Sequence, residues 1–112
     1  MNTKLIVIPT YDERANVRPI AAAVFDVDPR TDILFVDDNS PDGTGGIIDE
    51  LSDADERIHV LHREEKSGLG RAYISGFKWA LERHYQLVFE MDADFSHDPN
   101  EIPNFVRSEE RV

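Results

Sequence analysis

The amino-acid sequence predicts an α/β fold: a mostly parallel, Rossmann-like sheet with helices on both faces. Short apolar runs alternate with longer segments of helical periodicity along the 112 residues. The runs are continuous rather than alternating, as is typical of strands buried on both faces of a parallel sheet. Strand–helix alternation with right-handed crossovers produces such a doubly wound sheet. The length suits one domain with a modest core.

Four strands are expected at the apolar runs, over residues 5–8, 32–38, 58–61 and 86–92. A polar segment follows each run: PTYDE, DDNSPDGT, HREEKSGLG and DADFSHD, in that order. Ligands of parallel sheets bind beyond the carboxyl ends of the strands. The four polar segments therefore predict one functional site at that edge.

Helices are expected between the strands. The clearest spans residues 69–84, where apolar side chains recur at steps of three and four. The first helix should begin near Asn16, which leaves Pro19 in the first turn, where its missing N–H costs little. A shorter helix is expected after the glycine-rich segment 40–46. Asp98 is a good N-cap for a last helix.

Composition narrows the classes of function. The absence of cysteine excludes a disulfide framework, a thiol nucleophile and a zinc–cysteine site. A formal net charge of −11 opposes binding to nucleic acid or anionic lipid unless a local basic patch overcomes it. No segment has the length of a transmembrane helix, and the start at Met1 lacks the pattern of a signal peptide. These features suit a cytoplasmic protein without a nucleic-acid partner.

Asp92 and Asp94 are the strongest candidates for a metal site. Side chains two residues apart in extended chain point the same way, so both carboxylates can face one ion. Oxygen ligands of this kind suit Mg²⁺ or Mn²⁺. A solvated acidic turn is the alternative, but the position directly after a buried strand favours the metal site. His97 is expected to be a loop histidine rather than a further ligand.

Asp37 and Asp38 end the second expected strand and precede a good turn at residues 40–43. One of the two aspartates can accept a hydrogen bond from a base or a ribose. The other can brace the loop. Spacing alone does not assign the two roles.

Two further segments are open to two interpretations each. Gly68 and Gly70 at a helix start resemble a loop that cradles phosphate, and a flexible strand-to-helix turn explains them equally well. Tyr11 could stack on a base and Glu13 could accept hydrogen bonds. An aromatic plug at the end of the sheet is the alternative for Tyr11.

Taken together, four ordered segments resemble a known family. VIPTYDERANV, ILFVDDNSPDGT, REEKSGLGRAYISGFKWAL and VFEMDADFSHDP are similar to the start of the polyprenol-phosphate (dolichol-phosphate) mannosyltransferases of glycosyltransferase family 2. The resemblance covers residues 5 to about 107. It implies a GT-A fold that transfers mannose from GDP-mannose to a polyprenyl (dolichyl) phosphate with inversion, as in protein glycosylation. It also implies a divalent cation, Mg²⁺ or Mn²⁺.

The resemblance implies two groups of site residues. The group expected to contact the nucleotide, base and ribose consists of Pro9, Tyr11, Glu13, Val36 and Asp38. The group expected at the diphosphate-sugar and metal consists of Asp92, Ala93, Asp94 and Ser96. Asp92 and Asp94 are the expected catalytic residues. Ser96 stands where some members place a further metal-side residue, in certain members a glutamine.

Members of the family continue well beyond the D-x-D motif. Residues 1–112 are therefore expected to form a single glycosyltransferase domain truncated after its donor-binding half. The implied acceptor is a polyprenyl phosphate at the membrane surface. The implied location is the cytoplasm, peripheral to the cytoplasmic face of the membrane, with a missing C-terminal segment or a separate subunit as the anchor.

Two other functions remain open from the sequence. A receiver-like signalling domain has a similar length and an acidic Mg²⁺ pocket. Receivers, however, carry the acidic pair after the first strand, whereas here the pair follows the second. The remaining alternative is an inactive fragment that binds nucleotide.

Overall fold

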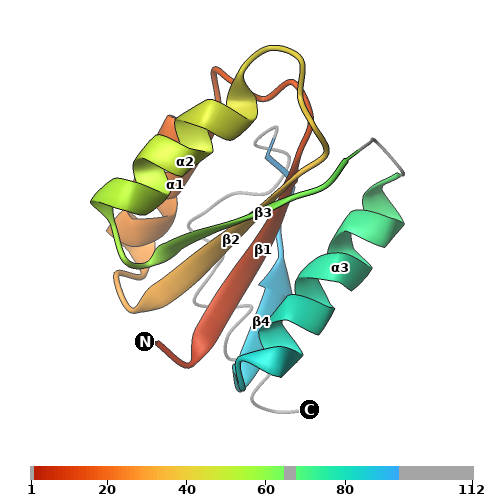
Figure 1. The fold of residues 1–112 in the computed structure, drawn as a ribbon. Helices are drawn as coiled ribbons and strands as arrows, with labels where there is room; N and C mark the ends of the chain where they lie inside the picture. Colours follow the sequence, from red (N-terminus) through yellow and green to blue (C-terminus); the bar gives the residue numbers. More distant parts are fainter. Residues whose placement is uncertain (1, 65–67, 94–112) are drawn as a thin grey trace.

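One parallel sheet with helices on both faces makes up the computed structural model, which describes residues 2–64 and 68–93. In chain order the elements are β1 (Lys4–Thr10), α1 (Val17–Val27), β2 (Thr31–Asp37), α2 (Thr44–Ala54), β3 (Ile58–His62), α3 (Leu69–Glu82) and β4 (Leu87–Glu90). The strands lie in the order β3-β2-β1-β4, and all neighbours are parallel (Figure 1). The predicted fold class is confirmed.

The register brings three strand ends to one level. Thr10 of β1 pairs with Asp37 of β2, which in turn pairs with His62 of β3. β4 is shorter, and its last residue, Glu90, pairs with Val7. The carboxyl ends of all four strands therefore lie at one edge of the sheet, as the sequence predicts.

Alternate residues of the strands pack against different helices. Ile6, Phe35 and Ile58 belong to a core cluster with side chains of α1 and α2. Leu5 and Leu34 belong to a second cluster with side chains of α3. Figure 1 shows α1 and α2 on one face of the sheet and α3 on the other. Burial of both faces explains why the strands are apolar throughout.

The first helix begins where the sequence predicts. Asn16 is the N-cap of α1, and Pro19 is its third residue, where a backbone N–H has no partner within the helix. The second helix is shorter than the third, as expected, but it does not start where the sequence predicts. α2 starts inside the glycine-rich segment, at Thr44, and has 11 residues, as many as α1.

Close packing explains why glycine stands in the first turn of α2. A Cβ atom on Gly45 would lie 3.1 Å from Asp37 Oδ2 and 3.2 Å from the ring of His62. Gly45 therefore lets the helix approach the ends of β2 and β3. Gly43, the N-cap, has a φ of 89°, a conformation that glycine adopts without steric cost.

α3 lies very close to the sheet at its middle. A Cβ atom on Gly76 would be 2.5 Å from Val7 Cγ1, so a larger residue would force the helix away. Leu81 follows the apolar periodicity of this helix, yet its side chain is 72% exposed, so the periodicity overstates the buried face near the end of the helix. Ile74 is 54% exposed as well.

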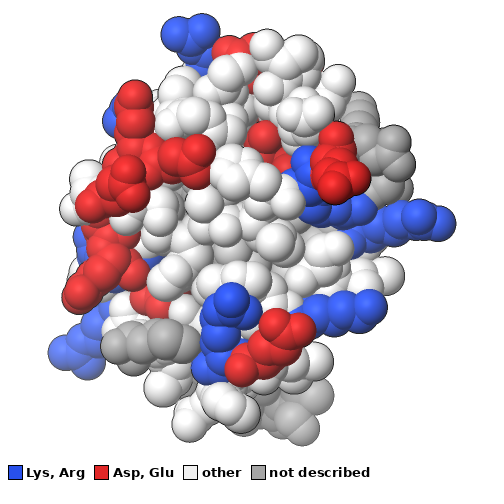
Figure 2. All heavy atoms as spheres, viewed as in Figure 1, with Lys and Arg blue, Asp and Glu red and all other residues white. Residues whose placement is uncertain are grey.

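Charge is unevenly spread over the surface. Acidic side chains gather over α2 and the turn after it, whereas lysine and arginine are prominent near α3 (Figure 2). Among the described residues, no helix is both long and apolar enough to cross a membrane. The helix expected to follow Asp98 lies outside the described residues.

Candidate functional site

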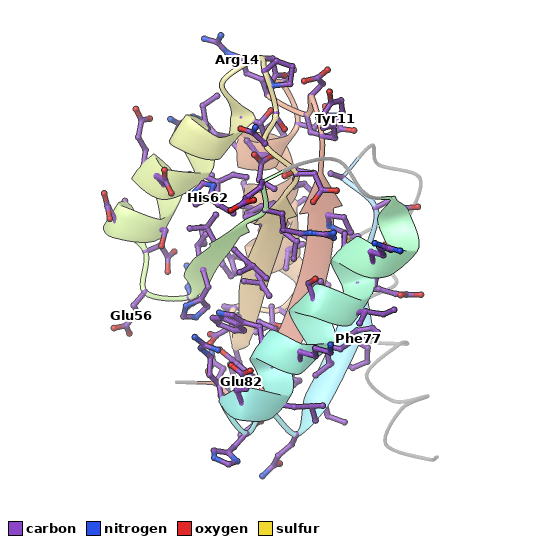
Figure 3. The ribbon with its side chains drawn as sticks, turned by 45° about the vertical axis from the view of Figure 1, so that its right-hand side comes forward. Tyr11, Arg14, Glu56, His62, Phe77 and Glu82 are labelled. Atoms are coloured by element: carbon purple, nitrogen blue, oxygen red, sulfur yellow. The ribbon has the colours of Figure 1, made fainter. Side chains whose placement is uncertain are left out.

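The polar segments after β1, β2 and β3 contact one another beyond the carboxyl edge. Tyr11 and Arg14 lie beyond the end of the sheet, and His62 lies at the end of β3 (Figure 3). Asn39 Nδ2 donates to the main-chain oxygen of Glu64 at 3.0 Å, which joins the second segment to the third. The expected convergence of these loops is confirmed.

Hydrogen bonds fasten the first loop to the second. The main-chain nitrogen of Asp12 donates to Ser40 Oγ at 3.1 Å, and that of Glu13 donates to Thr44 Oγ1 at 3.1 Å. The nitrogen of Arg14 donates to Asp42 Oδ2 at 3.2 Å. Side chains of one loop thus satisfy the backbone of the other, so the two loops form one platform.

Asp42 is an ionised part of this platform. It accepts hydrogen bonds from the hydroxyl and the backbone nitrogen of Thr44. The hydroxyl contact holds the pKa of Asp42 below its usual value. Asp42 thereby braces the start of α2 while it anchors the first loop.

Asp37 is the bracing member of the aspartate pair. Its carboxylate accepts hydrogen bonds from Thr10 Oγ1 at 2.8 Å, from Ser40 Oγ at 2.6 Å and from the Ser40 nitrogen at 3.1 Å. The side chain is buried, at 2% exposure. A buried carboxylate with this many donors has a structural role.

Asp38 differs from Asp37 in its hydrogen bonds. It is 5% exposed, yet its carboxylate accepts no hydrogen bond from the part of the chain that the structure describes, and its buried Oδ1 is unsatisfied. A cation lies beside it, with Arg63 Nε 3.4 Å from Oδ1. The structure therefore distinguishes the two aspartates by their hydrogen bonds. Asp38 stands where the sequence predicts a nucleotide contact.

The other expected nucleotide contacts differ in what they offer. Tyr11 is 36% exposed and lies beyond the end of the sheet. Glu13 accepts a hydrogen bond from Asn16 Nδ2 at 2.9 Å, which occupies one of its oxygens. The side chain of Val36 is fully buried against α3, and its main chain lies within β2, between β1 and β3. Pro9 lies near the end of β1, next to the loop.

The expected metal group is described in part. Tyr73 of α3 donates a hydrogen bond to Asp92 Oδ1 at 2.8 Å, and Ala93 is buried. Asp94, Ser96 and His97 lie outside the described residues. Within residues 2–64 and 68–93, no group of three histidine or acidic side chains is placed to hold a metal. The oxygen of Asp92 is the type of ligand that Mg²⁺ and Mn²⁺ take.

Three residues at this edge were not indicated by the sequence motifs. Thr10 holds Asp37, Arg63 lies against Asp38, and Tyr73 holds Asp92. A positive charge directly after β3, at the edge where the loops converge, is a signal that could have indicated Arg63. Gly68, with a φ of 98°, precedes α3 as a turn requires, while residues 65–67 lie outside the described part.

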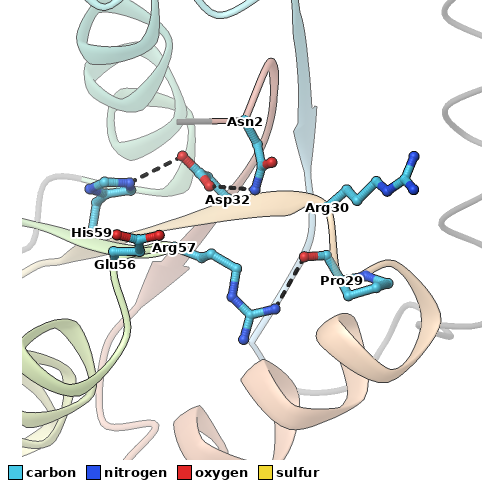
Figure 4. A pocket seen from close by; sticks show the side chains of 7 residues that line it. All are labelled: Asn2, Pro29, Arg30, Asp32, Glu56, Arg57 and His59. Atoms are coloured by element: carbon cyan, nitrogen blue, oxygen red, sulfur yellow. Dashed lines mark hydrogen bonds and ion pairs between the residues drawn. The ribbon is translucent and has the colours of Figure 1, made fainter.

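The opposite, amino edge of the sheet has its own polar cluster. Asp32 is 2% exposed and accepts hydrogen bonds from Tyr85 Oη at 2.5 Å, Asn2 Nδ2 at 3.0 Å and His59 Nε2 at 3.2 Å. Burial and the bond to Asp32 raise the pKa of Tyr85 above its usual value. A hollow of about 420 Å³ lies beside Asp32 and His59 (Figure 4).

The chain is similar to three curated relatives. It is 54% identical over 99 residues to the polyprenol monophosphomannose synthase of Mycolicibacterium smegmatis, covering 88% of this chain and 37% of that protein. It is 47% identical over 104 residues to the undecaprenyl-phosphate mannosyltransferase of Micrococcus luteus, covering 93% and 43%. It is 31% identical over 108 residues to the dolichol-phosphate mannosyltransferase of Saccharomyces cerevisiae, covering 92% and 39%. The chain thus spans less than half the length of these relatives.

Solved structures share the fold. A mannosyltransferase from Pyrobaculum calidifontis in complex with GDP-Man and Mn²⁺ matches with a TM-score of 0.68 and 20% identity, over 82% of this chain and 27% of that one. S. aureus TarS 1-349 in complex with UDP matches with a TM-score of 0.69 and 18% identity, over 99% and 32%. These likenesses confirm the expected GT-A type of fold.

The family follows from the sequence over almost the whole chain. The model of glycosyl transferase family 2 matches residues 5–111. This match, together with the strand order and the acidic pair after β2, argues against the receiver-domain alternative. The chain belongs to glycosyl transferase family 2.

Proposed function

We propose that the chain is the donor-binding half of an enzyme that transfers mannose from GDP-mannose to a polyprenyl phosphate with inversion. The observation that carries the proposal is Asp38, a buried carboxylate without a hydrogen-bond donor, at the edge where the loops converge. Relatives named as mannosyltransferases of polyprenol phosphates support the choice of sugar and acceptor. A related fold solved with GDP-Man and Mn²⁺ supports the donor and the cation.

In this proposal the nucleotide lies on the platform formed by the first two loops. Asp38 accepts a hydrogen bond from the base or the ribose, and Tyr11 offers an exposed ring on which a base can stack. Asp37 holds the shape of the platform through Thr10 and Ser40. The nucleotide would then satisfy the acceptor that the protein itself leaves unsatisfied.

The diphosphate lies toward the end of β4 in this proposal. Asp92, together with Asp94 and Ser96, would hold a Mg²⁺ or Mn²⁺ ion. The bound cation would stabilise the negative charge that develops on the leaving diphosphate. The bond from Tyr73 fixes one oxygen of Asp92, so the carboxylate is oriented before a ligand arrives.

The acceptor end of the proposal rests on chemistry rather than on described residues. A polyprenyl phosphate is already an anion and can attack the sugar without a strong general base. We place the enzyme at the cytoplasmic face of a membrane, with a further segment or a separate subunit as the anchor.

Titration calorimetry with GDP tests the proposal. The chain should bind GDP when Mn²⁺ or Mg²⁺ is present and should lose most of its affinity when a chelator removes the ion. Without a cation, the diphosphate meets a protein of net charge −11. Equal affinity with and without chelator would contradict the metal, and tighter binding of UDP than of GDP would contradict the donor.

A further inference from the structure

Arg63 lies where its main chain and its side chain contact both aspartates at the end of β2. It is the first residue after β3, and its backbone nitrogen donates to the carbonyl oxygen of Asp37 at 2.8 Å. Its Nε lies 3.4 Å from Asp38 Oδ1. The side chains are 17% and 7% exposed, so this ion pair is shielded from water. The backbone bond holds the main chain of Arg63 beside the end of β2.

The contact supplies charge but no hydrogen bond. Asp38 Oδ1 is buried and has no donor within hydrogen-bonding geometry among the described residues. A buried carboxylate is costly unless its charge is compensated. Arg63 provides that compensation without a hydrogen bond. The carboxylate of Asp38 can therefore still accept hydrogen bonds from a ligand. Asp37, by contrast, has its acceptor oxygens occupied by Thr10 and Ser40.

We infer that Arg63 is a positioning residue for nucleotide binding, which holds the Asp38 carboxylate in place as an acceptor for a nucleoside diphosphate. The inference rests on the proposed function, because it assumes that Asp38 contacts the nucleotide. Arg63 acts through Asp38 and does not itself touch the ligand. Substitution of Arg63 should therefore weaken nucleotide binding only when Asp38 is present.

A double-mutant cycle measures this dependence. GDP is titrated, with Mn²⁺, into the wild-type chain, Arg63→Gln, Asp38→Asn and the double variant. Each single substitution should weaken GDP binding about tenfold or more, since hydrogen bonds to charged groups are worth that much. In the Asp38→Asn background, Arg63→Gln should add less than about a twofold loss, because residues that act as one unit are not additive.

A matched control separates position from charge. Arg30→Gln removes the same charge from an exposed residue at the amino edge and should leave the affinity within about twofold of wild type. Arg63→Lys keeps the charge without the guanidinium and should bind with intermediate affinity. If Arg63→Gln does not fold, the cycle is run with Arg63→Lys, whose loss must also vanish beside Asp38→Asn.

Each alternative outcome has a distinct meaning. Additive losses in the cycle would overturn the inference, because Arg63 would then contact the nucleotide directly. Unchanged affinity in a folded Arg63→Gln chain would overturn it as well. No GDP binding by the wild-type chain would overturn the proposed function and this inference with it.

Discussion

The two ends of β2 each carry a buried aspartate, and the two differ in what surrounds them. Asp32, at the amino end, accepts hydrogen bonds from three different segments of the chain. Asp38, just past the carboxyl end, accepts none from the described residues and has a cation beside it. Their exposures are nearly equal, at 2% and 5%. Burial therefore does not distinguish them, whereas the supply of donors does.

This difference separates a structural site from a functional one. Buried polar groups in folded proteins are almost always hydrogen-bonded, so a satisfied carboxylate such as Asp32 needs no further explanation. An unsatisfied one such as Asp38 calls for a ligand or a strain that serves function. In our proposal the amino edge stabilises the fold, and the carboxyl edge binds the ligand.

The largest effect is expected from breaking the amino-edge cluster. Asp32→Asn should lower the free energy of unfolding by about 2 to 3 kcal/mol, because its amide cannot accept from all three donors and Tyr85 is left poorly paired. Chemical denaturation measures it. Asp38→Asn is the matched comparison. It gives up no hydrogen bond from the described residues but leaves Arg63 without its counter-charge, so it should cost less than Asp32→Asn, about 1 kcal/mol. Equal losses in the two variants would contradict the distinction.

The next effect concerns α3, which reaches both edges. Gly76→Ala should destabilise by about 1 to 3 kcal/mol, since its Cβ would lie 2.5 Å from Val7 Cγ1. Gly46→Ala in α2 is the control, because no atom lies within 4 Å of its added Cβ. It should be neutral or stabilising by up to about 1 kcal/mol. A loss in the control as large as in Gly76→Ala would remove the packing explanation.

A smaller effect is expected at Tyr85, and it depends on pH. The pKa of Tyr85 is raised in the folded state, so the fold binds this proton more tightly than the unfolded chain does. This contribution is complete below about pH 10, the usual tyrosine value, and is lost as pH rises above it. Tyr85→Phe should cost about 1 kcal/mol at neutral pH and reduce the loss of stability at alkaline pH. A stability–pH curve with the same alkaline slope in both proteins would argue against it.

The smallest stability effect is expected at the carboxyl edge. Tyr73→Phe removes the hydroxyl that donates to Asp92 and should change stability by less than about 1 kcal/mol, because the pair is partly exposed. It should nevertheless weaken Mn²⁺-dependent GDP binding several-fold, because the Asp92 carboxylate would no longer be held in position to bind the metal. Calorimetry and a melting curve on the same sample measure both. A large change in melting temperature with unchanged binding would make Tyr73 a structural residue.

The architecture could be predicted from the sequence because buried strands are recognisable as runs of apolar residues. Strands covered on both faces must be apolar throughout, so their positions and the edge where their loops meet could be predicted. The first helix was predictable from Asn16 and Pro19 for a similarly local reason. The start of α2 was not, since Gly45 and Gly46 look like helix breakers. The helix tolerates Gly45 because Asp37 and His62 leave no room for a side chain there.

The division of roles among the aspartates could not be predicted in the same way. Asp37 and Asp38 are neighbours in sequence, and what separates them is contact with Thr10 and Ser40 on one side and Arg63 on the other. Asp32, near the start of a mostly apolar strand, is a signal in the sequence for the polar cluster at the amino edge. Its partners come from the amino terminus, from β3 and from the turn between α3 and β4, which are brought together by folding alone.

The assignment of the ligand to the carboxyl edge is tested most directly by nuclear magnetic resonance. Amide chemical shifts are recorded while GDP and Mg²⁺ are added to the wild-type chain. The account predicts that shifts move in residues 10–14, 36–45 and 62–64, and that those of residues 28–32 and 55–59 at the amino edge stay in place. Changes centred on Asp32 and His59, with the carboxyl-edge loops unaffected, would contradict it.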